Sequence, residues 1–225
     1  MGRSILANRG SDHMVWDLVI GTHNGKKGAE LADLLAPYRF RIVTLAEVEQ
    51  AIDVVEDGES FAENAEKKAV QQARHLNRWV LADDSGIEVD ALQCAPGIYS
   101  ARYAGPNASD EDNNARLLEE LGELPLHQRT ARYICHVTVS DPAGNVRAES
   151  HATCGGRIRF APSGKNGFGY DPLFEVIEYH RTFGDLGPTV KRALSHRSRA
   201  LRAIIPQLAK LKSSGTWKPD QATPP

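Results

Sequence analysis

The sequence predicts an α/β protein, because short apolar runs typical of buried strands alternate with amphipathic helices. Strands are expected at 17–21, 41–44, 79–82, 87–92, 132–140, 146–153 and 156–160. Helices are expected at 26–36, 60–77 and 109–121, with one more beginning after Ser195. A turn containing Pro and Gly separates 132–140 from 146–153, which predicts a hairpin there.

The composition limits the compartment and the partners. The 225 residues are 41% hydrophobic and 25% charged, which is ordinary for a soluble globular protein. A net charge of -2 offers no basic field for nucleic acid, and no apolar run approaches the roughly 20 residues of a membrane span. Cys94, Cys135 and Cys154 are scattered and odd in number, which favours a reducing compartment and predicts a cytoplasmic protein.

The two ends of the chain are expected to lie outside the folded domain. Residues 1–14 are predicted to be a disordered extension, and residues 15–211 to form one domain. Residues 212–225 are polar and contain Pro, which predicts a disordered tail. Within the last helix, Pro206 is expected to cause a kink or an end.

The first strand leads through a polar turn, Thr22-His23-Asn24-Gly25-Lys26-Lys27, into the first helix. A helix that begins in this way offers backbone N–H groups and the positive end of its dipole to a phosphate. Lys27 adds a mobile positive charge. The G-x-x-x-x-G-K-[ST] pattern is missing, so the turn is no Walker P-loop. An ordinary strand-to-helix loop with solvated lysines is the alternative.

The helix at 60–77 begins with the capping-box pattern S-x-x-E, in which Glu63 is the capping acid. Its small-residue stripe is expected to be buried and comprises Ala62, Ala65, Ala69, Ala73 and Leu76. Phe61, Asn64 and Lys68 share another face. We interpret Asn64 and Lys68 as groups that can reach a phosphate; a solvated lysine is the alternative.

The third strand is expected to stop at Asp83-Asp84-Ser85-Gly86. Neighbouring side chains of an extended chain point to opposite faces, so Asp83 and Asp84 are expected to have different roles. One can face a cleft and hold a cation, and the other can cap the following turn. Alternatively, both carboxylates only form an Asx turn with Gly86.

Two later segments add aromatic and basic groups. In 164–174, glycines flank Phe168 and Tyr170, a pattern that suits rings stacking on a flat base, although both rings could also join the core. Ser195 is a predicted N-cap that places His196 and Arg197 in the first turn of the last helix. Cations there oppose the helix dipole, which suggests an anionic partner; a solvated basic turn is the alternative.

Together these polar groups form three chemical sets. The residues able to hold a polyphosphate are Thr22, Asn24, Lys27, Lys68, Lys191 and Arg197. Glu56, Asp83 and Asp84 can hold a hard cation through oxygen atoms. Phe168 and Tyr170 can flank a base. Phosphates, a magnesium ion and a base together describe a nucleoside triphosphate.

The chain resembles the Ham1-like inosine/xanthosine triphosphate pyrophosphatases over about residues 17–210. The motifs that carry the resemblance occur in the matching order: T-H-N-G-K-K at 22–27, F-A-E-N-A-E-K-K-A at 61–69, L-A-D-D-S-G at 81–86, P-G-I-Y-S-A-R-Y at 96–103, G-F-G-Y-D-P-L-F at 167–174 and S-H-R at 195–197. The resemblance implies a mixed α/β sheet with flanking helices, and two lobes with the active cleft between them. It also implies a homodimer and the Mg²⁺-dependent hydrolysis of ITP, dITP and XTP to the monophosphate and pyrophosphate.

By position, the resemblance implies that Asp84 is the catalytic acid-base residue and a magnesium ligand. The implied substrate contacts are Thr22, His23, Asn24, Gly25, Lys26, Lys27, Lys68, Ser85, Phe168, Gly169, Tyr170, Asp171, Lys191, His196 and Arg197. The family often has two consecutive glutamates before its T-G-x-T-F segment, where this chain has Val55 and Glu56. Glu56 is our choice for the second metal ligand.

Base selection requires a donor aimed at the 6-oxo group of hypoxanthine or xanthine, because adenine presents an amino group there. Arg197, His196 or loop N–H groups are the candidates. Two other readings remain open. One is a pyrophosphatase for modified pyrimidine or canonical nucleotides. The other is a nucleotide- or RNA-binding module without turnover, for which the basic segment 192–202 and the loop aromatics are suited.

Overall fold

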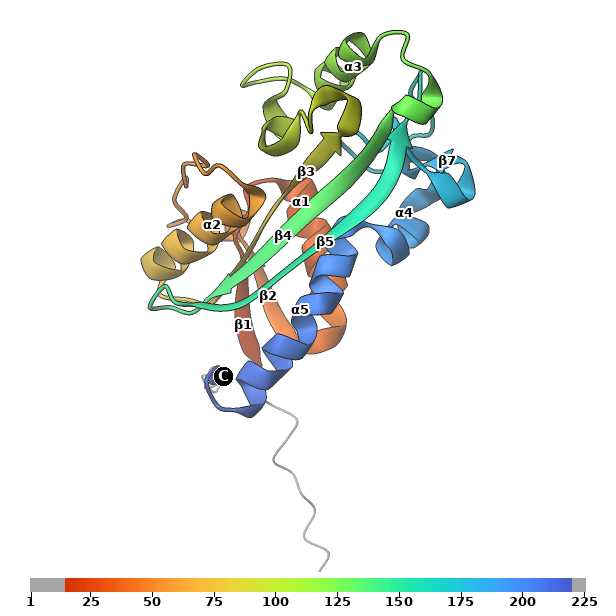
Figure 1. Ribbon diagram of the computed structural model, residues 1–225. Coiled ribbons are helices and arrows are strands. Elements are labelled where there is room, and N and C mark those ends of the chain that lie inside the picture. Colours follow the sequence, from red (N-terminus) through yellow and green to blue (C-terminus); the bar gives the residue numbers. More distant parts are fainter. Residues whose placement is uncertain (1–14, 220–225) are drawn as a thin grey trace, which may run out of the picture.

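The computed structural model describes residues 15–219, which contain one seven-stranded mixed sheet with helices on both sides (Figure 1). The strands are β1 (Trp16–Ile20), β2 (Phe40–Thr44), β3 (Val80–Val89), β4 (Thr130–Ser140), β5 (Val146–Ile158), β6 (Phe174–Val176) and β7 (Arg181–Thr182). Their order is β2-β1-β3-β4-β5-β6-β7; β1 is parallel to β2 and β3, and the remaining pairs are antiparallel. The predicted mixed α/β class is confirmed.

The helices begin where the sequence supplies capping side chains. They are α1 (Gly25–Leu35), α2 (Phe61–Leu76), α3 (Asp110–Leu121), α4 (Phe183–Leu194) and α5 (His196–Ser213). Asn24, Ser60, Ser109 and Ser195 accept hydrogen bonds from N–H groups of the first turns of α1, α2, α3 and α5, respectively. None of the helices in residues 15–219 is long and apolar enough to cross a membrane.

Two hydrophobic cores lie along the long central strands and account for the two lobes. The first core includes Leu81 of β3 and buried side chains of α1 and α5. The second includes Ile87 and Val89 of the same strand and buried side chains of α3. In Figure 1, α3 and α4 lie toward one end of β3, β4 and β5, and α2 and α5 lie along the other part. The polar segment Asp83–Ser85 therefore lies between two apolar cores.

The prediction that the third strand stops at Asp83 is wrong. β3 continues to Val89, with Asp83 opposite Val137 and Asp84 opposite His136 of β4, so neither aspartate belongs to an Asx turn. The separate strand predicted at 87–92 is the second half of β3, and the one predicted at 156–160 is the end of β5. Pairing with β4 outweighs the local preference of Asp, Ser and Gly for turns.

The C-terminal predictions also need correction. Pro206 does not end α5, because Leu201, Ile204 and Leu208 are buried in the first core on both sides of it. Residues 212–219 are not a disordered tail: Trp217 is buried, and its ring stacks on Trp79 with 4.3 Å between centroids. Residues 1–14 and 220–225, the rest of the two predicted disordered ends, lie outside the described residues.

Candidate active site

A pocket lies where β1 ends and its neighbour β3 continues. β1 pairs with β3 only through Val80 and Leu81, so the edge of β3 beyond Leu81 no longer has β1 beside it. The pocket has about 580 Å³ of empty space. Its walls come from both lobes and comprise Asn24, Lys27, Ser85, Gly86, Ser100, Ala101, Asp110, Asn113, Tyr133, Phe168, Gly169, Tyr170, Asp171, Lys191, His196 and Arg197. Position 86 requires glycine, because a Cβ there would lie 2.3 Å from Ser100 Oγ.

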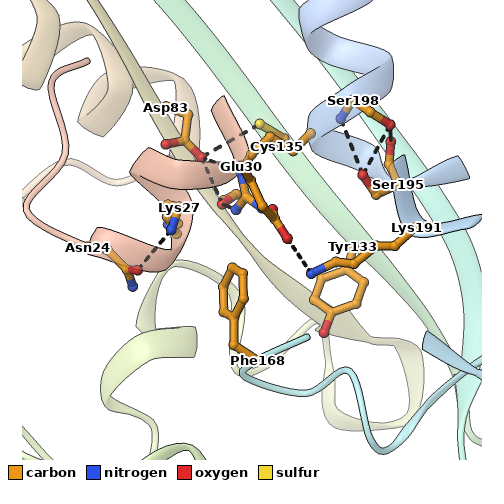
Figure 2. A network of polar contacts seen from close by, with 12 residues as sticks. Asn24, Lys27, Glu30, Asp83, Tyr133, Cys135, Phe168, Lys191, Ser195 and Ser198 are labelled. Carbon is orange, nitrogen blue, oxygen red and sulfur yellow. Dashed lines mark hydrogen bonds and ion pairs between the residues drawn. The ribbon is translucent and has the colours of Figure 1, made fainter. Parts of the chain in front are cut away.

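The turn between β1 and α1 forms one end of the pocket. Asn24 caps α1 by accepting the Lys27 N–H at 3.1 Å (Figure 2). The Asn24 N–H donates to Thr22 Oγ1 at 3.2 Å. These side chains fix the turn so that the N-terminus of α1 faces the pocket. Among the described residues, the Lys27 ammonium makes no hydrogen bond or ion pair, so it is available to an anion.

On the α2 side of β3, Asp84 belongs to a cluster with the buried Lys68 and the partly exposed Glu56. Lys68 Nζ donates to Asp84 Oδ1 at 2.9 Å and to Glu56 Oε2 at 3.1 Å, and Asn64 Nδ2 lies 3.5 Å from Asp84 Oδ2. Burial raises the pKa of Asp84, with a further contribution from Glu56, and these outweigh Lys68 and Lys27. Burial also acts on Glu56, but Lys68 lowers its pKa overall. Asp84 is therefore the carboxylate better suited to accept a proton.

On the opposite face of β3, Asp83 is fully buried in a different network (Figure 2). Arg197 Nε donates to Asp83 Oδ2 at 3.2 Å, Arg197 Nη2 donates to Ser85 Oγ at 2.9 Å, and Glu30 pairs with Nη1 of the same guanidinium. Glu30 also accepts from Lys191 Nζ at 2.7 Å, and Asp171 accepts from Lys191 at 2.6 Å. Burial would raise the pKa of Asp83, but the charges of Lys27 and Arg197 hold it well below its usual range.

The glycine-rich segment 164–174 supplies the aromatic wall. The Phe168 ring is half-buried, and Lys191 Nζ lies 4.3 Å from its centroid. Gly167 has φ +78°, and a Cβ there would lie 2.0 Å from Asp171 Oδ2, so only glycine permits this turn. Opposite, Tyr133 stacks on His196 with 4.5 Å between ring centroids. Burial, Arg197 and Lys191 together lower the pKa of His196 well below its usual value, so the imidazole is neutral.

Comparison with known proteins decides the family. The model of the Ham1 family matches residues 18–207. The chain belongs to the Ham1 family.

Relatives and solved structures agree with this family. A dITP/XTP pyrophosphatase of Rhodopirellula baltica is 57% identical over 202 residues, covering 90% of this chain and 97% of that protein. Another, of Desulforamulus reducens, is 44% identical over 194 residues, covering 86% of this chain and 96% of that protein. The structure of a Ham1 protein from Coxiella burnetii superposes with a TM-score of 0.78 at 36% identity, covering 87% of this chain and 99% of that chain. The fold of this Ham1 protein is thus shared along nearly its whole length.

Many predicted site residues of this Ham1 protein lie together. Asn24, Lys27, Ser85, Phe168, Gly169, Tyr170, Asp171, Lys191, His196 and Arg197 line one pocket. Asp84 and Lys68 do not line it; they lie on the other face of β3, next to Lys27, whose charge acts on both Asp83 and Asp84. The expectation that the two aspartates face opposite ways is confirmed, but Asp83 pairs with Arg197 and caps no turn.

Other predicted contacts have protein partners. His23 Nε2 lies 3.1 Å from the Ile52 carbonyl oxygen, and Lys26 Nζ donates to Asp110 at 3.0 Å. Tyr170 is buried, and its hydroxyl donates to Ser100 O at 2.9 Å, so its ring is a fixed part of the wall. The three side-chain nitrogen atoms of Arg197 donate to Asp83, Glu30 and Ser85. Thr22 and Gly25 shape the turn before α1.

The sequence analysis missed several polar residues of the site. Glu30 joins Lys191 to Arg197, and Asn113 and Asp110 line the pocket. Glu30 follows Lys26 by four positions on α1, so helical periodicity was the available signal. Asn64, which the sequence placed on one face with Lys68, bonds both Asp84 and the Gly58 N–H. Asp110 carried no such signal, because it looked like an ordinary acidic residue in the first turn of a helix.

The Asp84 cluster has the oxygen donors that a magnesium ion prefers. Asp84 and Glu56 share Lys68, so their oxygens converge on one cationic position. Within residues 15–219, however, no group of three or more Asp, Glu, His or Cys side chains is arranged to hold a metal. The residues therefore fit an ion that takes one or two carboxylates from the protein and its other ligands from substrate phosphate and water, which is usual for Mg²⁺.

Proposed function

We propose that this Ham1 protein hydrolyses non-canonical purine nucleoside triphosphates, ITP, dITP and XTP, to the monophosphate and pyrophosphate, and that it requires Mg²⁺. The observation that carries the proposal is the union of three parts: the α1 N-terminus with Lys27, the Asp84–Lys68–Glu56 cluster beside it, and the aromatic pocket of Phe168. The names of the relatives, dITP/XTP pyrophosphatases, support the same substrates.

In the proposed reaction, a water oxygen attacks the α-phosphorus, the bond to the bridging oxygen breaks, and pyrophosphate leaves. Asp84 orients that water and accepts its proton, for which its raised pKa is suitable. Lys27 and Lys68 stabilise the charge that develops on the phosphates. Mg²⁺, held by Asp84 and Glu56, supplies charge neutralisation and polarisation of phosphate oxygens when bound.

The paired state of the cations supports a role for a metal. Lys68, Lys191, Arg197 and Lys26 all contact carboxylates of the protein, so the site has little net positive charge for a triphosphate. The carboxylates would repel the substrate unless a divalent cation accompanied it. We therefore expect EDTA to abolish turnover.

His196 is better placed than Arg197 to read the 6-oxo group. It lines the pocket and is neutral, whereas the guanidinium of Arg197 is engaged by three neighbours. An imidazole N–H that faces the pocket would donate to the 6-oxo group of a purine. Adenine would leave a donor facing a donor, and such a mismatch discriminates strongly.

The deciding experiment measures pyrophosphate release from ITP, dITP, XTP, ATP, GTP, dTTP and UTP, with and without EDTA. Preferential turnover of the first three, lost with EDTA, is the expected result. Preference for dTTP or UTP would favour the pyrimidine reading, and binding without turnover would favour a binding module.

The proposal includes a cytoplasmic homodimer. The three cysteines, Cys94, Cys135 and Cys154, are all free, which supports a reducing compartment. The dimer rests on the family resemblance, and sedimentation equilibrium measures it directly: a mass of one chain at micromolar concentration would refute it.

A further inference from the structure

The first turns of α3 form hydrogen bonds to the loop that carries Phe168. Asp110 Oδ2 accepts the Gly169 N–H at 2.9 Å, and Asn114 Nδ2 donates to the Gly169 carbonyl oxygen at 3.0 Å. Asp110 and Asn114 are four residues apart, so they lie on one face of the helix. Both hydrogen-bonding groups of Gly169 are thus held from one side, and Phe168 is the adjacent residue.

Asp110 also reaches the other lobe. Its Oδ2 accepts from Lys26 Nζ at 3.0 Å, and Lys26 belongs to the first turn of α1, next to Lys27. α1 contributes to the first core and α3 to the second, so this contact spans the cleft. Lys26 Nζ further lies 5.8 Å from the centroid of Phe168. One carboxylate oxygen therefore contacts both the aromatic loop and the helix whose N-terminus faces the pocket.

The backbone on either side of Phe168 depends on such contacts. Gly167 and Gly169 on either side of it both have positive φ, so the backbone there can adopt many conformations unless it is held. Besides the contacts of Gly169, the Phe168 N–H itself donates to Asp171 Oδ2 at 2.8 Å. Asp110 and Asp171 together restrict the two consecutive N–H groups that determine where the ring lies.

We propose that Asp110 is a positioning residue that holds Phe168 in its base-stacking position through Gly169 and, through Lys26, ties that loop to the phosphate-binding end of the site. The proposal rests on the function proposed above for the identity of the substrate. It places Asp110 on the base side of recognition, so its loss acts on nucleotides and spares a ligand that has no base.

The chain offers variants that separate the two contacts. Asp110→Ala removes both, Asp110→Asn keeps an oxygen acceptor for the Gly169 N–H but loses the charge that pairs with Lys26, and Lys26→Gln removes only the contact between lobes. Glu111→Gln is the matched control, because Glu111 is the next residue of the same turn, is exposed, and makes no contact with the loop. Thermal unfolding of each variant establishes that it is folded.

The measurements are kcat and KM for ITP, the inhibition constant of inorganic tripolyphosphate, and amide hydrogen exchange of the 166–171 segment without nucleotide. For Asp110→Ala we expect KM to rise roughly tenfold, the scale of one lost charge-assisted hydrogen bond, with kcat changed much less. The inhibition constant of tripolyphosphate should change by less than about twofold, because tripolyphosphate has no base to contact Phe168. The Gly169 amide should exchange faster. Asp110→Asn should restore the protection of the Gly169 amide and part of the KM, and Lys26→Gln should resemble it, because both variants lose only the contact between lobes.

The proposal is overturned if Asp110→Ala leaves the KM for ITP and the amide exchange as in the wild type, or if Asp110→Asn is as impaired as Asp110→Ala. It is also overturned if the inhibition constant of tripolyphosphate rises as much as the KM for ITP. If Asp110→Ala fails to fold, Lys26→Gln decides: a KM for ITP unchanged from that of Glu111→Gln refutes the link between lobes. Wild-type protein that turns over none of the triphosphates refutes the proposed function instead, and hydrogen exchange still tests the grip on Gly169.

Discussion

Asp83 and Asp84 are neighbours in one strand, yet the structure gives them opposite surroundings. Asp83 faces the α5 side, where it is fully buried and paired with Arg197, and its pKa is held far below normal. Asp84 faces the α2 side, shares Lys68 with Glu56, and has a raised pKa. Strand alternation thus separates a carboxylate paired with a buried arginine from the carboxylate that we propose to be catalytic, within a single peptide unit.

The two clusters also differ in which cation contacts the aspartate directly. Asp83 pairs with the buried guanidinium of Arg197, whereas Asp84 and Glu56 share one ammonium, that of Lys68. The charge of Lys27 acts on both aspartates. One lysine for two carboxylates leaves room for a further positive charge beside Asp84. Asp83 and Arg197 are both buried, so we expect the loss of their ion pair to affect folding more than catalysis.

The largest expected effect is on the rate. Asp84→Asn should lower the kcat for ITP by about a hundredfold to ten-thousandfold, the usual contribution of general-base catalysis, because the amide cannot accept the proton. Nucleotide binding should persist, as measured by calorimetry with ITP. The control is Glu66→Gln, at an exposed position of α2, which should turn over like the wild type. Unchanged turnover in Asp84→Asn would remove this residue from the mechanism.

The same change one residue earlier should act on stability. Asp83→Asn leaves the buried Arg197 with one carboxylate fewer, and we expect a loss of about 3 kcal/mol in the free energy of unfolding. Because the folded pKa of Asp83 is depressed, its contribution is present above the unfolded pKa and disappears as pH falls below it. Denaturant titrations at neutral and acid pH measure both. A variant as stable as the wild type would contradict the structural role of Asp83.

A smaller effect is expected at Lys191, which joins Asp171 to Glu30 beside Phe168. Lys191→Ala should raise the KM for ITP by roughly tenfold, the scale of one charge-assisted contact. Arg192→Ala is the matched control, because that side chain is exposed and pairs with Asp33. The backbone carbonyl oxygen of Arg192, which accepts from Arg202, is kept in the alanine variant. An unchanged affinity for ITP would disprove the assignment of Lys191.

The smallest expected effect concerns His196. Its pKa is lowered well below normal by burial, Arg197 and Lys191, so it should remain neutral over the pH range in which an exposed histidine titrates. The imidazole resonances of His196 in an NMR titration should therefore not move in this range, and the pH dependence of KM should contain no histidine step. Protonation at lower pH would oppose folding, because only the unfolded state binds that proton readily. A titration midpoint near the ordinary histidine value would contradict the buried, uncharged imidazole.

Local pattern was sufficient for much of the fold. The caps Asn24, Ser60, Ser109 and Ser195, and the alternation of Tyr133, Cys135, Val137 and Val139 along β4, all lie in a few consecutive residues. The errors occurred where distant partners decide. β3 passes through a turn-like sequence because β4 pairs with it, and Trp217 is buried because Trp79 and Phe40 provide a surface for it.

The sequence by itself determined that Asp83 and Asp84 face opposite ways, since alternation is a property of any extended chain. It also determined the motifs of the family, and through them the polar turn before α1 and the aromatic loop. Only the tertiary structure decided which aspartate meets Arg197 and which meets Lys68, because these cations are 114 and 16 residues away and their positions depend on how α5 and α2 pack on the two faces of the sheet. It likewise placed Asp110 against Gly169, 59 residues on, where no local pattern could have predicted the contact.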